Sequence, residues 1–204
     1  MSLIKFCGLF QDDDIMYANK LKPDFAGFVF AESRRKVSVE KSIHLKNMLD
    51  KNIKSVGVFL NNTYDEILNI CIKNIIDIIQ IHGNISNEFI DKLKSDTNKP
   101  VIKALNIKDF ADILSLEKSH ADYVLIDSPK AGSGIKFDYS ILEAAKSRGF
   151  NRDYFLAGGI NIKNIDEALS MKPYCIDISS GIEKDGVKDY KLMEEIINKV
   201  RRSI

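Results

Sequence analysis

Short apolar segments alternate with longer amphipathic segments along this chain. The short segments are rich in Ile, Val and Phe and have the length of a β-strand. The longer ones place apolar residues three and four positions apart, as Phe110, Ile113 and Leu114 are, which is typical of one face of a helix. This alternation indicates βα units around a parallel sheet. The segments predicted as strands are Leu3–Cys7, Phe25–Phe30, Ser55–Leu60, Ile76–His82, Val101–Leu105, Tyr123–Asp127, Tyr154–Ala157 and Cys175–Ser179.

The number of repeated units favours one fold class. Eight strand–helix units make a (β/α)8 TIM barrel, and the 204 residues leave about 25 residues per unit, near the lower limit of that fold. No room remains for a second domain. The sequence therefore predicts an α/β protein in which residues 1–204 form a single (β/α)8 TIM barrel domain, with a doubly wound open sheet as the alternative.

Polar residues mark several helix starts. The acidic residues 12–14 open the first predicted helix, where the helix dipole favours negative charge. Ser86, Asp138 and Asn161 precede later amphipathic segments and are predicted as N-caps.

Charge and composition favour a small-molecule substrate. Lys and Arg number 30 against 29 Asp and Glu, so the net charge of +1 gives no electrostatic signature of nucleic acid or an anionic membrane as partner. The first apolar run is too short for a signal peptide and no later stretch has the length of a membrane span. We therefore expect a cytoplasmic protein, either a monomer or a homodimer.

The cysteines indicate reduced thiols. Cys7, Cys71 and Cys175 are an odd number at wide spacing, which fits neither a disulfide framework nor a zinc site, and no metal site is predicted. Cys71 lies at helical spacing among apolar residues and Cys175 begins a strand, so both are interpreted as packing residues.

Two strands end on groups that could transfer protons. Side chains alternate along a strand, so Lys5 and Cys7 share a face opposite Ile4 and Phe6, and in a barrel that face points inward. Asp127 ends an otherwise apolar strand, where an unpaired carboxylate is costly unless the site uses it. The active site of this fold lies at the C-terminal ends of its strands, so Cys7 and Asp127 could flank one ligand as base and acid.

Glycine-rich turns follow the last strands. Gly158 and Gly159 follow the seventh predicted strand, and Ser180 and Gly181 follow the eighth. Glycine lets backbone N–H groups approach a phosphate closely, and barrel enzymes often bind phosphate at these two turns. Gly134, in the loop after the sixth strand, is a further candidate contact to the substrate.

Arginines follow the second predicted strand. Arg34 and Arg35 carry planar groups that bind carboxylates at two points. From the residues alone, either arginine could make such a contact, and the two could exchange roles.

Taken in order, the strand-end segments resemble the motif set of the phosphoribosylanthranilate isomerase family. The resemblance covers the chain from Lys5 to about Lys188. The segments are KFCG, SRRKVS, VGVF, IIQIHG, VIKA, LIDS followed by GSG and FDY, LAGGI and DISSGIE.

This resemblance implies a role for each matching residue. Cys7 takes the general-base position and Asp127 the general-acid position, while Arg35 contacts the anthranilate carboxylate. His82 and Asp177 match positions that line the pocket. The residues implied to hold the phosphate are Gly158, Gly159, Ser180 and Gly181.

The implied reaction is the Amadori rearrangement of N-(5-phosphoribosyl)anthranilate to 1-(2-carboxyphenylamino)-1-deoxyribulose 5-phosphate in tryptophan biosynthesis. It needs no cofactor, because the iminium formed on ring opening is itself the electron sink. Lys5 is a candidate for lowering the pKa of Cys7. Burial among apolar residues is expected to raise the pKa of Asp127. These shifts predict a bell-shaped pH profile with Cys7 on its acidic limb and Asp127 on its basic limb.

Other interpretations stay open. His82 could be an ordinary buried histidine, and Asp177 could only bond a loop backbone. The chain could be another phosphate-binding barrel enzyme, such as a sugar-phosphate epimerase or the synthase that acts next in the pathway. A barrel that only binds a phosphorylated ligand would be expected to lack Cys7 or Asp127, and both are present.

Overall fold

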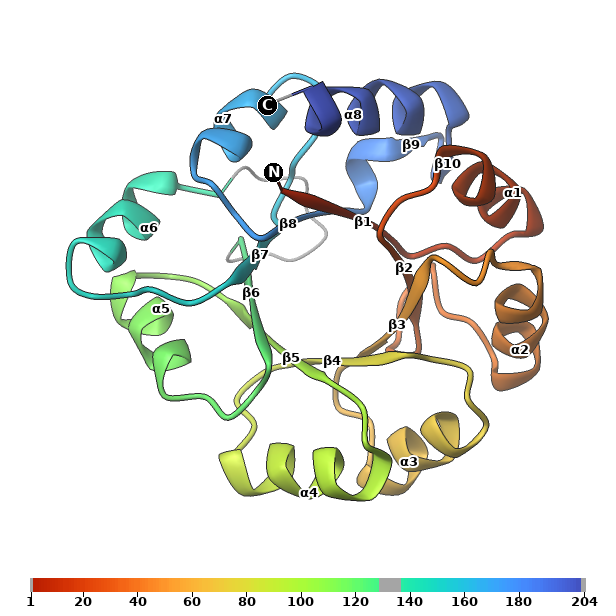
Figure 1. Ribbon diagram of the computed structural model, residues 1–204, viewed down its shortest axis with the longest axis horizontal. Helices are drawn as coiled ribbons and strands as arrows, with labels where there is room; N and C mark the ends of the chain where they lie inside the picture. Colours follow the sequence, from red (N-terminus) through yellow and green to blue (C-terminus); the bar gives the residue numbers. More distant parts are fainter. Residues whose placement is uncertain (1, 129–136, 203–204) are drawn as a thin grey trace.

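The structure, a computed structural model, describes residues 2–128 and 137–202. Eight parallel strands follow one another around a closed barrel, and β8 pairs with β1 to complete it (Figure 1). This closure confirms the predicted TIM barrel over the doubly wound alternative. The strands are β1 Leu3–Cys7, β2 Phe25–Val29, β3 Lys54–Phe59, β4 Ile78–His82, β5 Val101–Asn106, β6 Tyr123–Asp127, β7 Tyr154–Leu156 and β8 Cys175–Ile178.

The helices form an outer ring around the barrel (Figure 1). They are α1 Asp12–Leu21, α2 Val39–Met48, α3 Tyr64–Ile72, α4 Asn87–Thr97, α5 Phe110–Glu117, α6 Tyr139–Lys146, α7 Ile165–Ser170 and α8 Tyr190–Arg202. Between β8 and α8 the chain forms a short 3-10 helix, η1 Ser180–Ile182, and a two-stranded hairpin, β9 Glu183–Lys184 and β10 Val187–Lys188. Among the described residues, no helix is both long and apolar enough to cross a membrane.

The predicted helix starts are mostly confirmed. Acidic residues 12–14 open α1, and the side chains of Ser86 and Asp138 cap α4 and α6. The prediction for Asn161 is wrong, because α7 begins later, after Asn164 at its N-cap position. Asn161 instead holds the preceding turn: its side chain accepts from the backbone N–H of Lys163 and donates to the carbonyl of Gly159.

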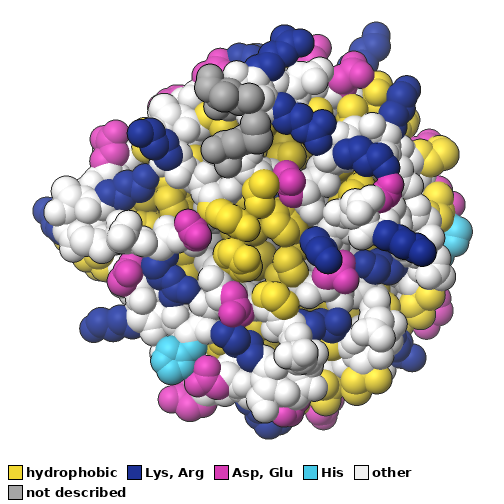
Figure 2. All heavy atoms as spheres, in the orientation of Figure 1, with side chains coloured by type: hydrophobic (Ala, Val, Ile, Leu, Met, Phe, Trp, Pro, Cys, Tyr) yellow, Lys and Arg dark blue, Asp and Glu magenta, His cyan; other side chains and the backbone are white. Residues whose placement is uncertain are grey.

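Apolar side chains form two clusters, one between the strands and the helices and one inside the barrel. Side chains on the outer face of the strands, such as Phe6, pack with the helices in the larger core. Inside the barrel, a second cluster around Phe25 and Phe155 fills part of the interior, and Tyr123 and Tyr174 pack against it. Figure 2 shows hydrophobic side chains gathered at the centre of one end of the barrel, ringed by charged ones.

Strand register separates this apolar filling from the polar interior. Lys5 lies beside Phe25 on one neighbouring strand and beside Asp177 on the other. The polar side chains that point inward therefore begin at this level and continue towards the C-terminal ends of the strands, which is where active sites of this fold lie.

Candidate active site

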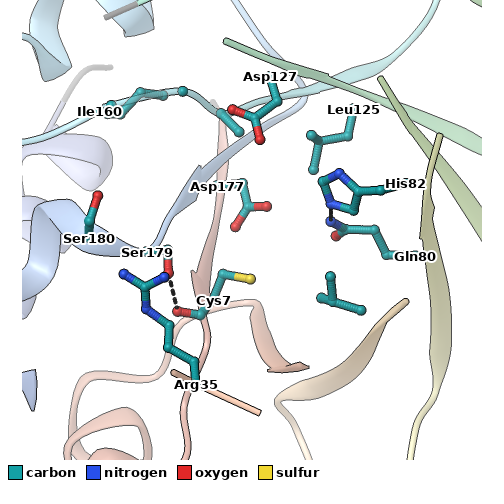
Figure 3. A pocket seen from close by; sticks show the side chains of 14 residues that line it. Cys7, Arg35, Gln80, His82, Leu125, Asp127, Ile160, Asp177, Ser179 and Ser180 are labelled. Carbon is teal, nitrogen blue, oxygen red and sulfur yellow. Dashed lines mark hydrogen bonds between the residues drawn. The ribbon is translucent and has the colours of Figure 1, made fainter. Parts of the chain in front are cut away.

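A pocket with about 570 Å³ of empty space, including the part open to solvent, lies at the C-terminal ends of the strands (Figure 3). Its walls come from both halves of the barrel, because β1, β4, β6, β7 and β8 all contribute side chains or turns. A neighbouring hollow is lined by Gly181 and shares Gly159 and Ser180 with the pocket. Gly134 lies outside the described residues. The residues named from the sequence that line the pocket are Cys7, Arg35, His82, Asp127, Gly158, Gly159, Asp177 and Ser180.

A buried lysine connects the polar residues of the interior. Lys5 is fully buried, and its Nζ lies 2.8 Å from Asp177 Oδ2, 2.7 Å from Gln80 Oε1 and 3.3 Å from Cys7 Sγ. Burial alone would lower the pKa of Lys5, but the charges of Asp177 and Cys7 outweigh it and raise that pKa. Lys5 is therefore a permanent cation beside the thiol.

The pKa of Cys7 differs from the expectation. Burial raises the pKa of the thiol, the charge of Lys5 lowers it and that of Asp177 raises it again, so that the pKa ends above its ordinary value. Lys5 acts in the predicted direction, but burial is the larger effect, and Asp177 offsets part of the lysine's positive charge. In the ligand-free protein the thiol is thus protonated near neutral pH.

Asp127 has the properties of a general acid. Its Oδ1 accepts a hydrogen bond of 2.7 Å from the backbone N–H of Ser128, and the side chain is buried at the end of β6. Burial, reinforced by the negative charge of Asp177, raises the pKa of Asp127 to about 6, although the hydrogen bonds from Ser128 oppose the shift. This agrees with the expectation that burial would help the carboxyl group to hold its proton.

Asp177 has one oxygen left for a ligand. Its Oδ2 pairs with Lys5, while its buried Oδ1 has no hydrogen-bond partner among the described residues. Figure 3 shows the carboxylate within the pocket, between Asp127 and Cys7. A buried acceptor without a partner is costly, so this oxygen is suited to a donor on a bound molecule.

An acidic side chain holds Arg35 at the rim of the pocket. Arg35 Nε and Nη2 lie 2.6 and 2.9 Å from the two carboxylate oxygens of Glu183. Lys188 Nζ lies 2.7 Å from Glu183 Oε1, and Arg34 also pairs with this carboxylate. Burial would raise the pKa of Glu183, but Arg35 and Lys188 outweigh it and lower the pKa to about 2. Arg34 is exposed and does not line the pocket.

The glycine turns bring the ends of β7 and β8 close together. Gly158 and Gly159 both have positive φ, 94° and 65°, which a side chain disfavours. A Cβ on Gly181 would lie 1.9 Å from the carbonyl oxygen of Ile160, so only glycine allows the two turns to approach this closely. The turns therefore border one hollow, which is lined in addition by Asn161 and Lys163.

Sequence reasoning missed three residues of this site. Gln80 lies two positions before His82, and the alternation that places Cys7 on the inner face could have placed Gln80 there as well. Glu183 ends the quoted segment DISSGIE, but no role was predicted for it, and Lys188 left no comparable signal. Both residues lie on the hairpin after β8 and reach the site only through its fold. Cys71 and Cys175 are buried free thiols outside the pocket, as predicted.

Comparison with known proteins identifies the family. A family model described as N-(5'phosphoribosyl)anthranilate (PRA) isomerase matches residues 4–199. An N-(5'-phosphoribosyl)anthranilate isomerase of Endomicrobium trichonymphae is 41% identical to this chain over 209 residues, with 100% of both sequences covered. The one from Thermoanaerobacter sp. strain X514 is 39% identical, with 98% of each covered.

Solved structures agree with the sequence comparison. The crystal structure of phosphoribosyl anthranilate isomerase from Thermus thermophilus has a TM-score of 0.88 at 28% identity, with 98% of each chain covered. A phosphoribosyl anthranilate isomerase in complex with reduced 1-(o-carboxyphenylamino)-1-deoxyribulose 5-phosphate has a TM-score of 0.85 at 27% identity, covering 98% of this chain and 99% of that chain. This chain therefore belongs to the N-(5'-phosphoribosyl)anthranilate isomerase family.

Proposed function

We propose that this protein catalyses the Amadori rearrangement of N-(5'-phosphoribosyl)anthranilate, the isomerisation of an aminoaldose to an aminoketose in tryptophan biosynthesis. The observation that carries the proposal is the placement of Cys7 and Asp127. The thiol on β1 and the carboxyl group on β6 come from opposite parts of the barrel and line the same pocket (Figure 3). A base and an acid on two sides of one ligand suit a reaction that adds one proton and removes another.

Asp127 is the general acid of the first step. It donates its proton to the ring oxygen of the ribose while the bond from that oxygen to C1' breaks, and the nitrogen lone pair forms an iminium. The raised pKa of Asp127, about 6, supports this role, because about a tenth of the carboxyl groups is protonated at pH 7, against about a thousandth at the ordinary pKa of an aspartic acid.

Cys7 is the general base of the second step. Its thiolate removes the proton from C2', and the C–H electron pair forms the C1'–C2' double bond while the iminium nitrogen becomes neutral. The enolamine then tautomerises to the ketone. Substrate and product are isomers, so no electrons are exchanged with a cofactor. Lys5 supports the thiolate, because its ammonium lies 3.3 Å from Cys7 Sγ.

Charged and polar groups of the pocket and of the neighbouring hollow suit the two charged ends of the substrate. We assign the anthranilate carboxylate to Arg35 and the phosphate to the turns at Gly158–Gly159 and Ser180–Gly181, with His82 and Asp177 lining the rest of the pocket. The solved relative that holds a reduced product-like sugar phosphate supports a ligand of this size and chemistry in this family.

The proposal is tested with freshly generated phosphoribosylanthranilate, by following the loss of its fluorescence. We expect turnover far above the spontaneous decay. Cys7→Ser and Asp127→Asn keep the size of each side chain but remove the base and the acid, so each is expected to lower kcat by about 10²–10⁴-fold while a product analogue still binds. If phosphoribosylanthranilate decayed only at the uncatalysed rate in the presence of the wild-type protein, the proposed function would be contradicted. Near-normal kcat for Cys7→Ser would contradict the role of the thiol alone.

We also propose a cytoplasmic enzyme that is a monomer or a homodimer. Three free, buried cysteines suit a reducing compartment. Among the solved relatives, the phosphoribosylanthranilate isomerase of Thermotoga maritima is dimeric and has been converted into monomers. Ultracentrifugation of the wild-type chain decides between the two states.

A further inference from the structure

Two polar side chains of β4 form a hydrogen bond inside the barrel. Gln80 Nε2 lies 2.9 Å from His82 Nε2, and both residues line the pocket (Figure 3). This distance alone does not show which residue donates the hydrogen. An imidazole nitrogen can donate or accept, and the oxygen and nitrogen of a glutamine amide look alike.

Lys5 defines the direction of the bond. An ammonium group has only donors, and Lys5 Nζ lies 2.7 Å from Gln80 Oε1, so the atom facing Lys5 must be the amide oxygen. The amide nitrogen therefore faces His82. An amide nitrogen has only donors as well, so His82 Nε2 must accept the bond.

The second nitrogen of His82 then carries the proton. Burial, together with the positive charge of Lys5, lowers the pKa of His82 to about 4, so the ring is neutral near neutral pH. A neutral imidazole has one proton, and the hydrogen bond at one nitrogen decides which nitrogen holds it. With Nε2 accepting from Gln80, the proton is on Nδ1. Within residues 2–128 and 137–202, Nδ1 has no hydrogen-bond partner.

We propose that Gln80 is a positioning residue that fixes His82 as a neutral Nδ1–H donor towards an oxygen atom of the bound substrate. Lys5 orients the Gln80 amide, and the amide orients the tautomer of His82. In this state His82 cannot act as a base through Nε2, because the lone pair of that nitrogen is already occupied. His82 instead recognises an acceptor, which gives the pocket a directional contact on the wall opposite Arg35. The identity of the acceptor rests on the proposed function, whereas the tautomer does not.

The tautomer is measured by nitrogen NMR of the ligand-free protein labelled with ¹⁵N-histidine. We expect a protonated Nδ1 and an unprotonated Nε2 for His82 at neutral pH. His44 and His120 are exposed and serve as internal references, and His82→Asn identifies the His82 signals by their loss. A protonated Nε2 in the wild-type protein would overturn the proposal.

Gln80→Glu is the decisive variant. It keeps the length of the side chain and the contact with Lys5 but replaces the amide donor by an acceptor, so the proton of His82 is expected to move to Nε2. Gln80→Leu removes the donor without adding charge and is expected to release the preference for Nδ1. If both variants kept the wild-type tautomer while remaining folded by circular dichroism, Gln80 would not be setting it.

Kinetics separate positioning from a merely structural role. Loss of one hydrogen bond to the substrate should lower kcat/KM on the order of tenfold in Gln80→Leu. The same substitution should have a much smaller effect in a His82→Phe background, because no tautomer is left to fix. An equal loss in both backgrounds would show that Gln80 does not act through His82. An inactive wild-type enzyme would contradict the proposed function but leave the NMR result valid.

Discussion

Arg35 and Glu183 form a two-point ion pair that joins the loop after β2 to the hairpin after β8. The Nε–Oε1 and Nη2–Oε2 distances are 2.6 and 2.9 Å, and the two residues lie 148 positions apart in the sequence. The pair occupies one edge of the guanidinium and leaves Nη1 without a partner among the described residues. Glu183 therefore holds the planar group at the pocket rim in a defined orientation, with its free donors available to a carboxylate.

Replacement of Arg35 should affect substrate binding more than replacement of Arg34. Arg35→Ala removes donors that face the pocket, and a charge-assisted contact of this kind contributes about 1.5–3 kcal/mol, so KM should rise about 10–100-fold. Arg34→Ala serves as the matched control, because Arg34 binds the same Glu183 from the exposed side. Steady-state kinetics on both variants checks this. Similar small effects would place the carboxylate contact elsewhere.

Glu183→Gln should destabilise the protein in a pH-dependent way. The change leaves Lys188, whose side chain is fully buried, without its anionic partner, and we expect a loss of about 1–3 kcal/mol at pH 7. The pKa of Glu183 is lowered to about 2 in the folded protein, against about 4.3 when unfolded, so its stabilising effect is present above pH 4.3 and disappears as the pH falls towards 2. Urea unfolding of both proteins at pH 7, 4 and 2.5 measures this difference, which should shrink with acid. If the difference in unfolding free energy between the two proteins stayed the same at all three pH values, the lowered pKa of Glu183 would be contradicted.

Inorganic phosphate should stabilise the protein through the turns after β7 and β8. A ligand that binds only the folded state raises Tm, and at about 100 times its Kd the gain is about 2.7 kcal/mol. Gly181→Ala should abolish the shift, because its Cβ would collide with the carbonyl of Ile160 and separate the turns. His82→Asn should keep the phosphate shift, since His82 lies on β4, across the pocket from these turns (Figure 3). Thermal scans with and without millimolar phosphate decide this, with sulfate as a second anion.

The sequence predicts those parts of the site that depend on local pattern. Period-two alternation is enough to place Cys7 inside the barrel, and the parallel topology brings Asp127 and the glycine turns to the same end. Contacts made across the fold were not predictable in this way. Gln80 meets Lys5 across 75 positions, and Glu183 meets Arg35 only because the hairpin after β8 folds over the rim.

Local pattern also fails where a property depends on the whole environment. Lys5 and Cys7 are neighbours on one strand face, which indicates a lowered thiol pKa. The structure reverses the net effect, since burial of Cys7 and the charge of Asp177 both act in the opposite direction. Neither the depth of burial nor the position of a residue on a distant strand can be derived from two neighbouring side chains.

This reversal changes the expected pH profile of the reaction. The reactive form needs a Cys7 thiolate and a protonated Asp127. The pKa of Asp127 is about 6, whereas that of Cys7 lies above its usual value of about 8.5, so Asp127 loses its proton first as the pH rises. Between the two pKa values, the main form has an ionised Asp127 and a neutral thiol. This main form and the reactive form carry the same number of protons, so the ratio between them does not change with pH. The reactive form is therefore a constant small fraction of the enzyme between the two pKa values.

The rate should therefore rise through about pH 6 with Asp127 on the acidic limb and fall above the pKa of Cys7 on the basic limb, the reverse of the assignment made from sequence. We expect kcat/KM to give this bell for the free enzyme, although coupling between the groups shifts the apparent values. The assignment is checked by the rate of Cys7 alkylation against pH, with Cys7→Ser as the control for Cys71 and Cys175. The rate of Cys7 alkylation should rise over the same pH range in which the basic limb falls. Asp127→Asn should leave this pH dependence of the alkylation rate nearly unchanged. An alkylation rate that instead rises through pH 6 would return the acidic limb to Cys7.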